Sequence, residues 1–332
     1  MLNRRWVLAR RPDGVLRSSD FERSDIALGE ISEGEVRVRV THLSFAPTQR
    51  IWIERDSYLP AVPIGGVVRA FGVGEVTKSN LPEFSVGDVV EGGFGWQDYW
   101  QGPATTDLWR ITRLPKDMTP EEALGVFGVT STTAWFGVED ILRPQAGETA
   151  LVSAAAGATG SAAGQILKAA GVRVIGIAGG PDKARWVTEV AGFDACIDYR
   201  HEDVSARIRA LAPGGVDMVY ENVGGAILDA ALENLALHAR IAFCGAIAGY
   251  DGGEVEGLKR YLNLVVRRAT ITGFLVQDYK HRNDEAVAAL KALLAQGRFI
   301  NALDVQHGFE RIPDTLGRLF AGKNLGKQIL IL

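Results

Sequence analysis

A glycine-rich turn near the middle of the chain has the residue types needed to hold a phosphate. The apolar run TALVSA (149–154) leads into AAGATG (155–160), and a helical stretch follows. Gly157 would let backbone N–H groups approach a pyrophosphate, and Gly160 would let strand and helix pack closely, with the helix N-terminus facing the anion. Because strand, turn, helix and second strand follow in order, we predict dinucleotide binding. A nucleotide-methyltransferase-like sheet and close packing without a ligand are the alternatives.

The end of the second strand indicates which dinucleotide binds. NAD sites place an acidic residue there for the ribose 2′-hydroxyl, but this chain has Gly179-Gly180-Pro181. Lys183 and Arg185 follow at once, and Tyr199-Arg200 end the next strand. A 2′-phosphate near Lys183 and Tyr199 is therefore expected, which predicts NADP(H). The alternative is that Lys183 and Arg185 are solvated residues of a helix.

The elements that would position these residues follow a simple pattern. Between about 148 and 276, apolar strands alternate with helical stretches, which predicts βαβ units and a parallel sheet. Before about 126, short runs such as EVRVRVTHL (35–43) are broken by Gly, Pro and Asn and predict a β-rich, barrel-like domain. We predict an α/β fold with a catalytic domain at 1–126, a cofactor domain at 127–296 and a C-terminal return at 297–332.

Composition limits the possible partners and location. The 332 residues carry a formal net charge of −4, which argues against nucleic acid and anionic membranes as partners. The two cysteines, Cys196 and Cys244, form no disulfide framework and favour a reducing cytoplasm. The most hydrophobic long stretch, 151–178, is interrupted by Gln165, Lys168 and Arg173, so we expect no membrane span.

Nine segments distributed over both domains resemble one known family. They are LSFAPTQR (43–50), SYLPAVPIGGVV (57–68), FSVGDVVEGGFGWQDY (84–99), TAWFG (133–137), VSAAAGATGSAAGQ (152–165), ENVGG (221–225), CGAIAGY (244–250), GFLV (273–276) and GKNLGKQ (322–328). In these segments and their order, the chain resembles the medium-chain dehydrogenase/reductase superfamily. It looks most like the zinc-independent alkenal and alkenone double-bond reductases, which include prostaglandin and curcumin reductases. The resemblance implies a GroES-like catalytic domain and a Rossmann domain for NADP(H).

The resemblance also implies contacts with the cofactor. It assigns the pyrophosphate to Gly157, Ala158, Thr159 and Gly160, the 2′-phosphate to Lys183 and Tyr199, and the adenosine side to Asn222. It assigns the ribose and nicotinamide to Cys244, Gly245, Ala246, Ile247 and Tyr250, the carboxamide to main-chain groups of Phe274, Leu275 and Val276, and closure over the cofactor to Asn324. For Phe274 and Val276, simple packing in the strand core is the alternative.

Two positions depart from the family pattern. Many members have Tyr after Asp-Pro in the first catalytic-domain motif, where this chain has Ala46-Pro47-Thr48. Prostaglandin reductases carry a Tyr eight positions before the strand Phe, where this chain has Val266. The candidates for a catalytic phenol are then Tyr58, Tyr250 and Tyr261, and each could instead be a packed aromatic residue.

Metal ligands are missing from the motifs that would carry them. Zinc-dependent relatives use Cys, His and carboxylates, whereas SFAPT (44–48) and IGGVV (64–68) contain none. We therefore expect no metal and an electrophile that is already activated. Conjugate reduction fits, because hydride goes to the β-carbon and the charge spreads into an enolate that hydrogen bonds can stabilise. Trp52, Tyr58, Phe94 and Trp96 are expected around an apolar cleft for a small conjugated carbonyl substrate.

Two other functions are alternatives that the same sequence features would fit. A quinone reductase would use the same fold and NADPH, and a non-catalytic NADPH-binding protein would bind the cofactor without turnover. We also expect a homodimer, because the apolar, β-branched run ATITGFLV (269–276) reads as an edge strand, and such edges tend to be paired or covered.

Overall fold

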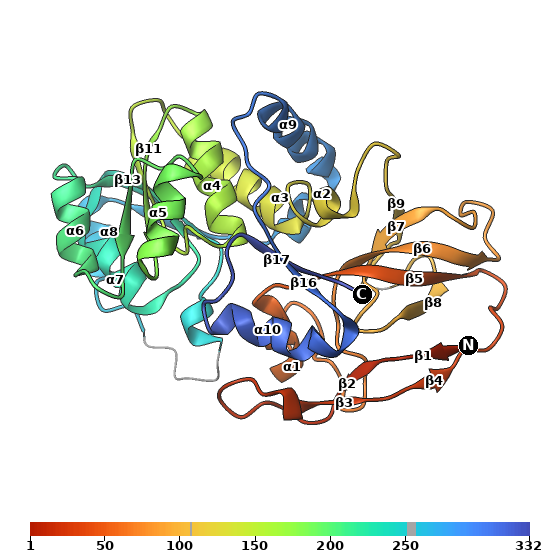
Figure 1. The fold of residues 1–332 in the computed structure, drawn as a ribbon. Coiled ribbons are helices and arrows are strands. Elements are labelled where there is room, and N and C mark those ends of the chain that lie inside the picture. The colour runs from red at the N-terminus through yellow and green to blue at the C-terminus, as the bar shows by residue number, and fades with distance from the viewer. Residues whose placement is uncertain (107, 251–256) are drawn as a thin grey trace.

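The structure, a computed structural model, describes residues 1–106, 108–250 and 257–332 and shows two lobes side by side (Figure 1). The helices are α1 (Thr48–Glu54), α2 (Pro120–Leu124), α3 (Val129–Phe136), α4 (Ala158–Ala169), α5 (Pro181–Glu189), α6 (Val204–Leu211), α7 (Gly225–Glu233), α8 (Leu262–Arg267), α9 (Asn283–Ala295) and α10 (Ile312–Phe320). Short 3-10 helices cover Ser18–Asp20, Ile247–Gly249, Val276–Arg282 and Phe309–Arg311, and a π-helical turn covers Gly137–Leu142.

The second lobe is a parallel six-stranded sheet in the order β12-β11-β10-β13-β14-β15. Its strands are β10 (Thr149–Val152), β11 (Arg173–Ala178), β12 (Ala195–Asp198), β13 (Val216–Glu221), β14 (Leu235–Phe243) and β15 (Thr270–Gly273). The strand order reverses between β10 and β13, which is where ligands of such sheets bind. The predicted Rossmann domain is therefore confirmed, with β15 at the expected sheet edge.

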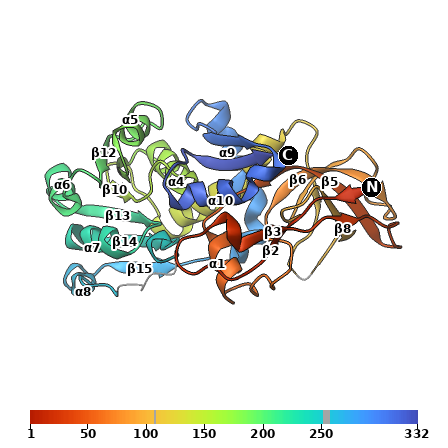
Figure 2. The same ribbon diagram turned by 60° about the horizontal axis from the view of Figure 1, so that its bottom comes forward.

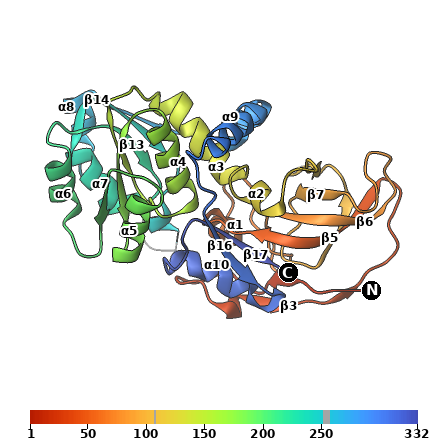
Figure 3. The same cartoon turned by 45° about the horizontal axis from the view of Figure 1, so that its top comes forward.

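Helices cover both faces of this sheet. One buried cluster joins residues of α3, α4 and α9 to the sheet, and a second joins residues of α6 and α7 to its other face. Figure 3 shows α3, α4 and α9 next to one another. The close approach of α4 depends on Gly164, where an added Cβ would lie 1.7 Å from the Phe193 ring. That contact fixes the height of α4, and therefore of its N-terminus, above the sheet.

The first lobe is β-rich, as predicted. Its main sheet follows the order β16-β17-β5-β6-β7-β9, with β8 paired to β5. The strands are β5 (Glu35–Ser44), β6 (Gly72–Ser79), β7 (Val89–Gly92), β8 (Tyr99–Pro103), β9 (Thr112–Arg113), β16 (Leu303–His307) and β17 (Lys327–Ile331). Two small sheets pair β1 (Leu2–Asn3) with β4 (Ile26–Ala27) and β2 (Trp6–Leu8) with β3 (Phe21–Arg23).

The C-terminal tail joins the two lobes. After α9 the chain returns to the first lobe, where β17 pairs antiparallel with β5 through Ile329 and Ser44. Figures 1 and 2 both show α10 between the lobes. At the start of β17, Gly326 N–H donates to Ala156 O at 2.8 Å, so the tail is bonded directly to the glycine-rich turn of the other lobe. This junction forms one wall of the candidate site.

Candidate functional site

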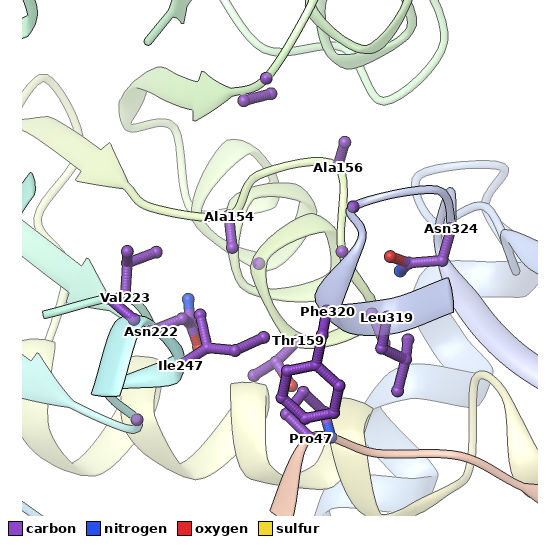
Figure 4. A pocket seen from close by; sticks show the side chains of 18 of the residues that line it. Pro47, Ala154, Ala156, Thr159, Asn222, Val223, Ile247, Leu319, Phe320 and Asn324 are labelled. Atoms are coloured by element: carbon purple, nitrogen blue, oxygen red, sulfur yellow. The ribbon is translucent and has the colours of Figure 1, made fainter. Parts of the chain in front are cut away.

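A cleft of about 500 Å³ lies between the lobes, at the carboxyl ends of β10, β11, β13 and β14. Its volume is in the usual range for a small-molecule or cofactor site. Figure 4 shows Asn222, Val223 and Ile247 on one side of the cleft and Pro47, Leu319 and Phe320 on another, with Asn324 from the tail. The cofactor lobe, the first catalytic-domain motif and α10 therefore all contribute to the cleft.

The glycine-rich turn presents backbone to the cleft. Ala154 has a φ of 50°, and Gly157 N–H donates to Ala154 O at 2.8 Å, so the chain turns sharply before α4. An added Cβ on Gly160 would lie 2.3 Å from Ala154 O, which explains why glycine is needed there. Among the residues that the structure describes, no side chain caps the N-terminus of α4. Its free N–H groups and the helix dipole suit a pyrophosphate.

Two cations line the end of the cleft that follows β11 and β12. Lys183 and Arg200 both face it beside Tyr199, and no carboxylate lies within ion-pair distance of either in the part of the chain that the structure describes. Burial, with a smaller effect from Arg200, lowers the pKa of Lys183. Two close cations without a carboxylate partner fit a 2′-phosphate. Arg185, by contrast, lies 3.7 Å from Asp182 and does not line the cleft.

A residue that was not predicted from the sequence, Asp198, shapes this end of the cleft. Asp198, the last residue of β12, accepts hydrogen bonds from Gly180 N at 2.7 Å and Arg200 N at 3.1 Å. Its other oxygen lies 2.7 Å from His201 Nδ1. The carboxylate thus accepts from the backbone of the turns that follow β11 and β12, and it does not line the cleft. Its position at a strand end next to Tyr199-Arg200 was the available signal.

The turn after β13 is held by a buried carboxylate. Glu221 accepts from Val223 N at 2.7 Å and Gly224 N at 2.6 Å, and burial raises its pKa to about 7. Asn222 Nδ2 donates to Ser153 O at 2.9 Å, which ties this turn to the glycine-rich turn. Asn222, Cys244, Gly245, Ile247, Tyr250 and Asn324 all line the cleft, as the resemblance implies.

Two of the three candidate tyrosines, Tyr58 and Tyr250, lie near each other, and Tyr261 lies elsewhere. Tyr250 lines the cleft, and its oxygen accepts from Ala246 N at 3.2 Å, while no acceptor for its phenol proton is found among residues 1–106, 108–250 and 257–332. Tyr58 is not part of the cleft lining, but it is 37% exposed and its phenol lies beside Thr48, which does line the cleft. Its ring is edge-on to Trp52, with ring centroids 6.2 Å apart. Tyr261 is 58% exposed at the start of α8, away from the cleft lining.

Several other expected residues lie elsewhere. Phe94 and Trp96 are fully buried in the core of the first lobe, and Trp52 is nearly so, which corrects the expectation that they surround the cleft. Large aromatic side chains are needed to fill the interior of that small lobe. Phe274 packs against Tyr220 and Tyr279, and neither it nor Leu275 or Val276 lines the cleft. The lining from Thr130, Leu319 and Phe320 was not predicted, because no motif marks these residues.

In residues 1–106, 108–250 and 257–332, no three His, Cys, Asp or Glu side chains gather as a metal site would require. Within the same ranges, no helix has the length and apolar character needed to cross a membrane.

Comparisons with known proteins agree with this geometry. Residues 4–111 match the family model described as the N-terminal domain of oxidoreductase, and residues 158–293 match the one described as zinc-binding dehydrogenase. The chain is 38% identical to NADPH-dependent curcumin reductase of Escherichia coli, covering 99% of this chain and 96% of the relative. It is 34% identical to an NADP(+)-dependent 2-alkenal reductase of Nicotiana tabacum, covering 99% and 97%. The crystal structure of CurA from Vibrio vulnificus in complex with NADPH superposes with a TM-score of 0.93 at 36% identity, covering 99% and 98%.

Proposed function

The chain belongs to the medium-chain dehydrogenase/reductase superfamily, with the NADPH-dependent curcumin and alkenal reductases among its relatives, and on that premise we propose that it reduces the C=C bond of α,β-unsaturated ketones and aldehydes with NADPH. One observation carries the proposal: a cleft with a dinucleotide turn also contains two cations without an ion-paired carboxylate and a phenol whose proton has no acceptor, as far as the described residues go. The relatives' names support the substrate class.

Each part of the cleft has a role in this reaction. NADPH, when bound, supplies the hydride. The N-terminus of α4 would bind its pyrophosphate, and Lys183 and Arg200 would bind its 2′-phosphate. Tyr250 is positioned to donate to the substrate carbonyl oxygen, where negative charge develops as the enolate forms. Burial raises the pKa of Tyr250, so its proton remains on the phenol at neutral pH.

The test uses NADPH deuterated at the transferable position and a simple conjugated enone. Deuterium should appear at the β-carbon of a saturated ketone. An allylic alcohol with deuterium on the carbinol carbon would instead identify a carbonyl reductase. A quinone panel run in parallel separates the quinone-reductase alternative, and tight NADPH binding without turnover on any of these compounds would favour a non-catalytic role.

The assembly state is a further part of the proposal. β15 lies at the edge of the sheet, and beside it α8 exposes Leu262, Val265 and Val266, which are 65%, 72% and 62% exposed. An exposed apolar edge of this kind tends to pair. We infer a homodimer through this surface, and a monomeric mass by light scattering at micromolar concentration would contradict it. Both cysteines are free, so we also infer residence in the reducing cytoplasm.

A further inference from the structure

Arg69, in the first lobe, is held in place through both its backbone and its side chain. Its carbonyl oxygen accepts from Nε2 of Gln49, a buried residue of α1, at 2.9 Å. Its Nη1 donates to Pro60 O at 3.0 Å, and its guanidinium lies over the Trp52 ring, 5.8 Å from the ring centroid. At that distance the ring attracts the cation. The charge of Arg69 therefore has a fixed position beside α1.

The other arginines that stack on aromatic rings show what is unusual about Arg69. Four of them also form an ion pair with a carboxylate, namely Arg4, Arg23, Arg113 and Arg282. Within residues 1–106, 108–250 and 257–332, only Arg69 and Arg200 stack on a ring without an ion-paired carboxylate. Arg200 lines the phosphate end of the cleft. Arg69 is thus a second stacked cation without an anionic partner, at the other end.

Helix α1 connects Arg69 to the cleft. Thr48, the first residue of α1, lines the cleft, and Trp52 lies one helical turn further on the same face. The Tyr58 ring is edge-on to Trp52, and its phenol lies beside Thr48 and near Tyr250. Tyr58 is also the neighbour whose charge acts on the Arg69 guanidinium. Arg69 is therefore one helical turn and one ring contact away from the reacting end.

The electrostatics of this region favour an anion. Arg69 is half-buried, and burial lowers the pKa of its guanidinium, which still remains charged at neutral pH. A charge that is partly removed from water without a counter-charge costs free energy, and a bound anion would offset that cost. The cleft lining contains no carboxylate among the described residues, so an anionic substrate would meet no like charge on entry.

We propose that Arg69 binds a carboxylate carried at the far end of the enone substrate, with the Tyr58 phenol as a second donor. The planar guanidinium can hold a carboxylate through two N–H groups. The enzyme then prefers conjugated ketones and aldehydes with an acidic chain over neutral ones of the same length. This inference rests on the proposed enone reduction, because it adds a second point of attachment for that substrate.

The test uses a series of straight-chain enones of increasing length, each ending in a carboxylate, together with their methyl esters. At the best chain length, wild-type kcat/KM should be higher for the acid than for the ester. Arg69→Met should lower kcat/KM for the acid by about tenfold, the low end for a charged hydrogen bond because the site is partly exposed. The loss should lie in KM, and the ester should be unaffected. Arg69→Lys, which keeps the charge, should retain part of the preference.

The matched control is Arg113→Met, because Arg113 also stacks on a ring of the first lobe but is paired with Asp88. It should leave the preference for the acid unchanged, and added salt should weaken that preference in wild type. A direct readout is the Kd of a saturated keto acid for the NADPH complex, measured by calorimetry, which should rise about tenfold in Arg69→Met.

Two results would overturn the inference and leave enone reduction standing. One is equal wild-type kcat/KM for acid and ester at every chain length. The other is an equal loss for both substrates in Arg69→Met. If wild type reduced no enone at all, the proposed function would be refuted instead. The Kd of the keto acid would then still show whether Arg69 binds the carboxylate.

Discussion

The phosphate end of the cleft is built from turns that directly follow β10, β11 and β12, whereas the reacting end combines side chains from segments far apart in the chain. At the first end, Gly157, Lys183 and Arg200 all follow neighbouring parallel strands. At the second, Thr48, Thr130 and Tyr250 come from three different elements far apart in the chain. A parallel sheet brings its carboxyl ends together by itself. The reacting end exists only once both lobes have docked.

The largest effect is expected from breaking the phosphate end. Lys183→Ala should weaken NADPH binding by about tenfold or more, and the double variant with Arg200→Ala by roughly 10²-fold or more, because each change removes a charged hydrogen bond. Binding of NADH, which lacks the 2′-phosphate, should change little. Fluorescence titration of both cofactors measures this, with Arg185→Ala as the matched control. Equal losses of affinity for NADH and NADPH would show that the cations do not bind the 2′-phosphate.

At the reacting end, Tyr250→Phe removes one donor and keeps the ring. We expect kcat for an enone to fall by about 10²-fold, a typical cost of losing one donor to a developing oxyanion, with the KM for NADPH nearly unchanged. Tyr261→Phe is the matched control, because that phenol is exposed away from the cleft. If the two variants have the same kcat, Tyr58, the ribose hydroxyl or a backbone N–H must hold the oxygen instead.

The difference between the two ends of the cleft explains which features could be predicted from the sequence. The parallel sheet, the glycine-rich turn and Lys183 with Tyr199 were all predicted, because each depends on residues close together in sequence. The contacts of Asp198 and Lys327 were not, since a carboxylate that turns toward backbone and a lysine buried by a distant loop leave no local pattern. The aromatic residues were assigned to the cleft wrongly for the same reason, because Phe94 and Trp96 are apolar whether they fill a core or line a cleft.

The junction of the lobes should make stability depend on pH. Burial lowers the pKa of Lys327 from 10.5 in the unfolded chain to about 7, so between these values the unfolded chain binds more protons. The free energy of unfolding should therefore rise with pH in that window, by at most about 1.4 kcal/mol per pH unit. Lys327→Met should remove this slope, and urea unfolding at pH 7, 8 and 9 compares the two proteins. Parallel slopes would mean that the lysine is not desolvated.

The smallest effect should come from Asp198→Asn, which tests whether the phosphate end depends on its supporting carboxylate. The amide keeps Oδ1 as the acceptor for both Gly180 N and Arg200 N, but it loses the carboxylate charge and the second oxygen that faces His201. Losing about one hydrogen bond should weaken NADPH binding only a few-fold. NADH binding should weaken less, because the displaced turn mainly places Arg200. His201→Gln is the control, since it removes the exposed partner and leaves both backbone bonds in place. A loss of NADPH affinity as large as that of Lys183→Ala would mean that Asp198 orders the whole turn. The phosphate end would then depend on a tertiary contact as much as the reacting end does.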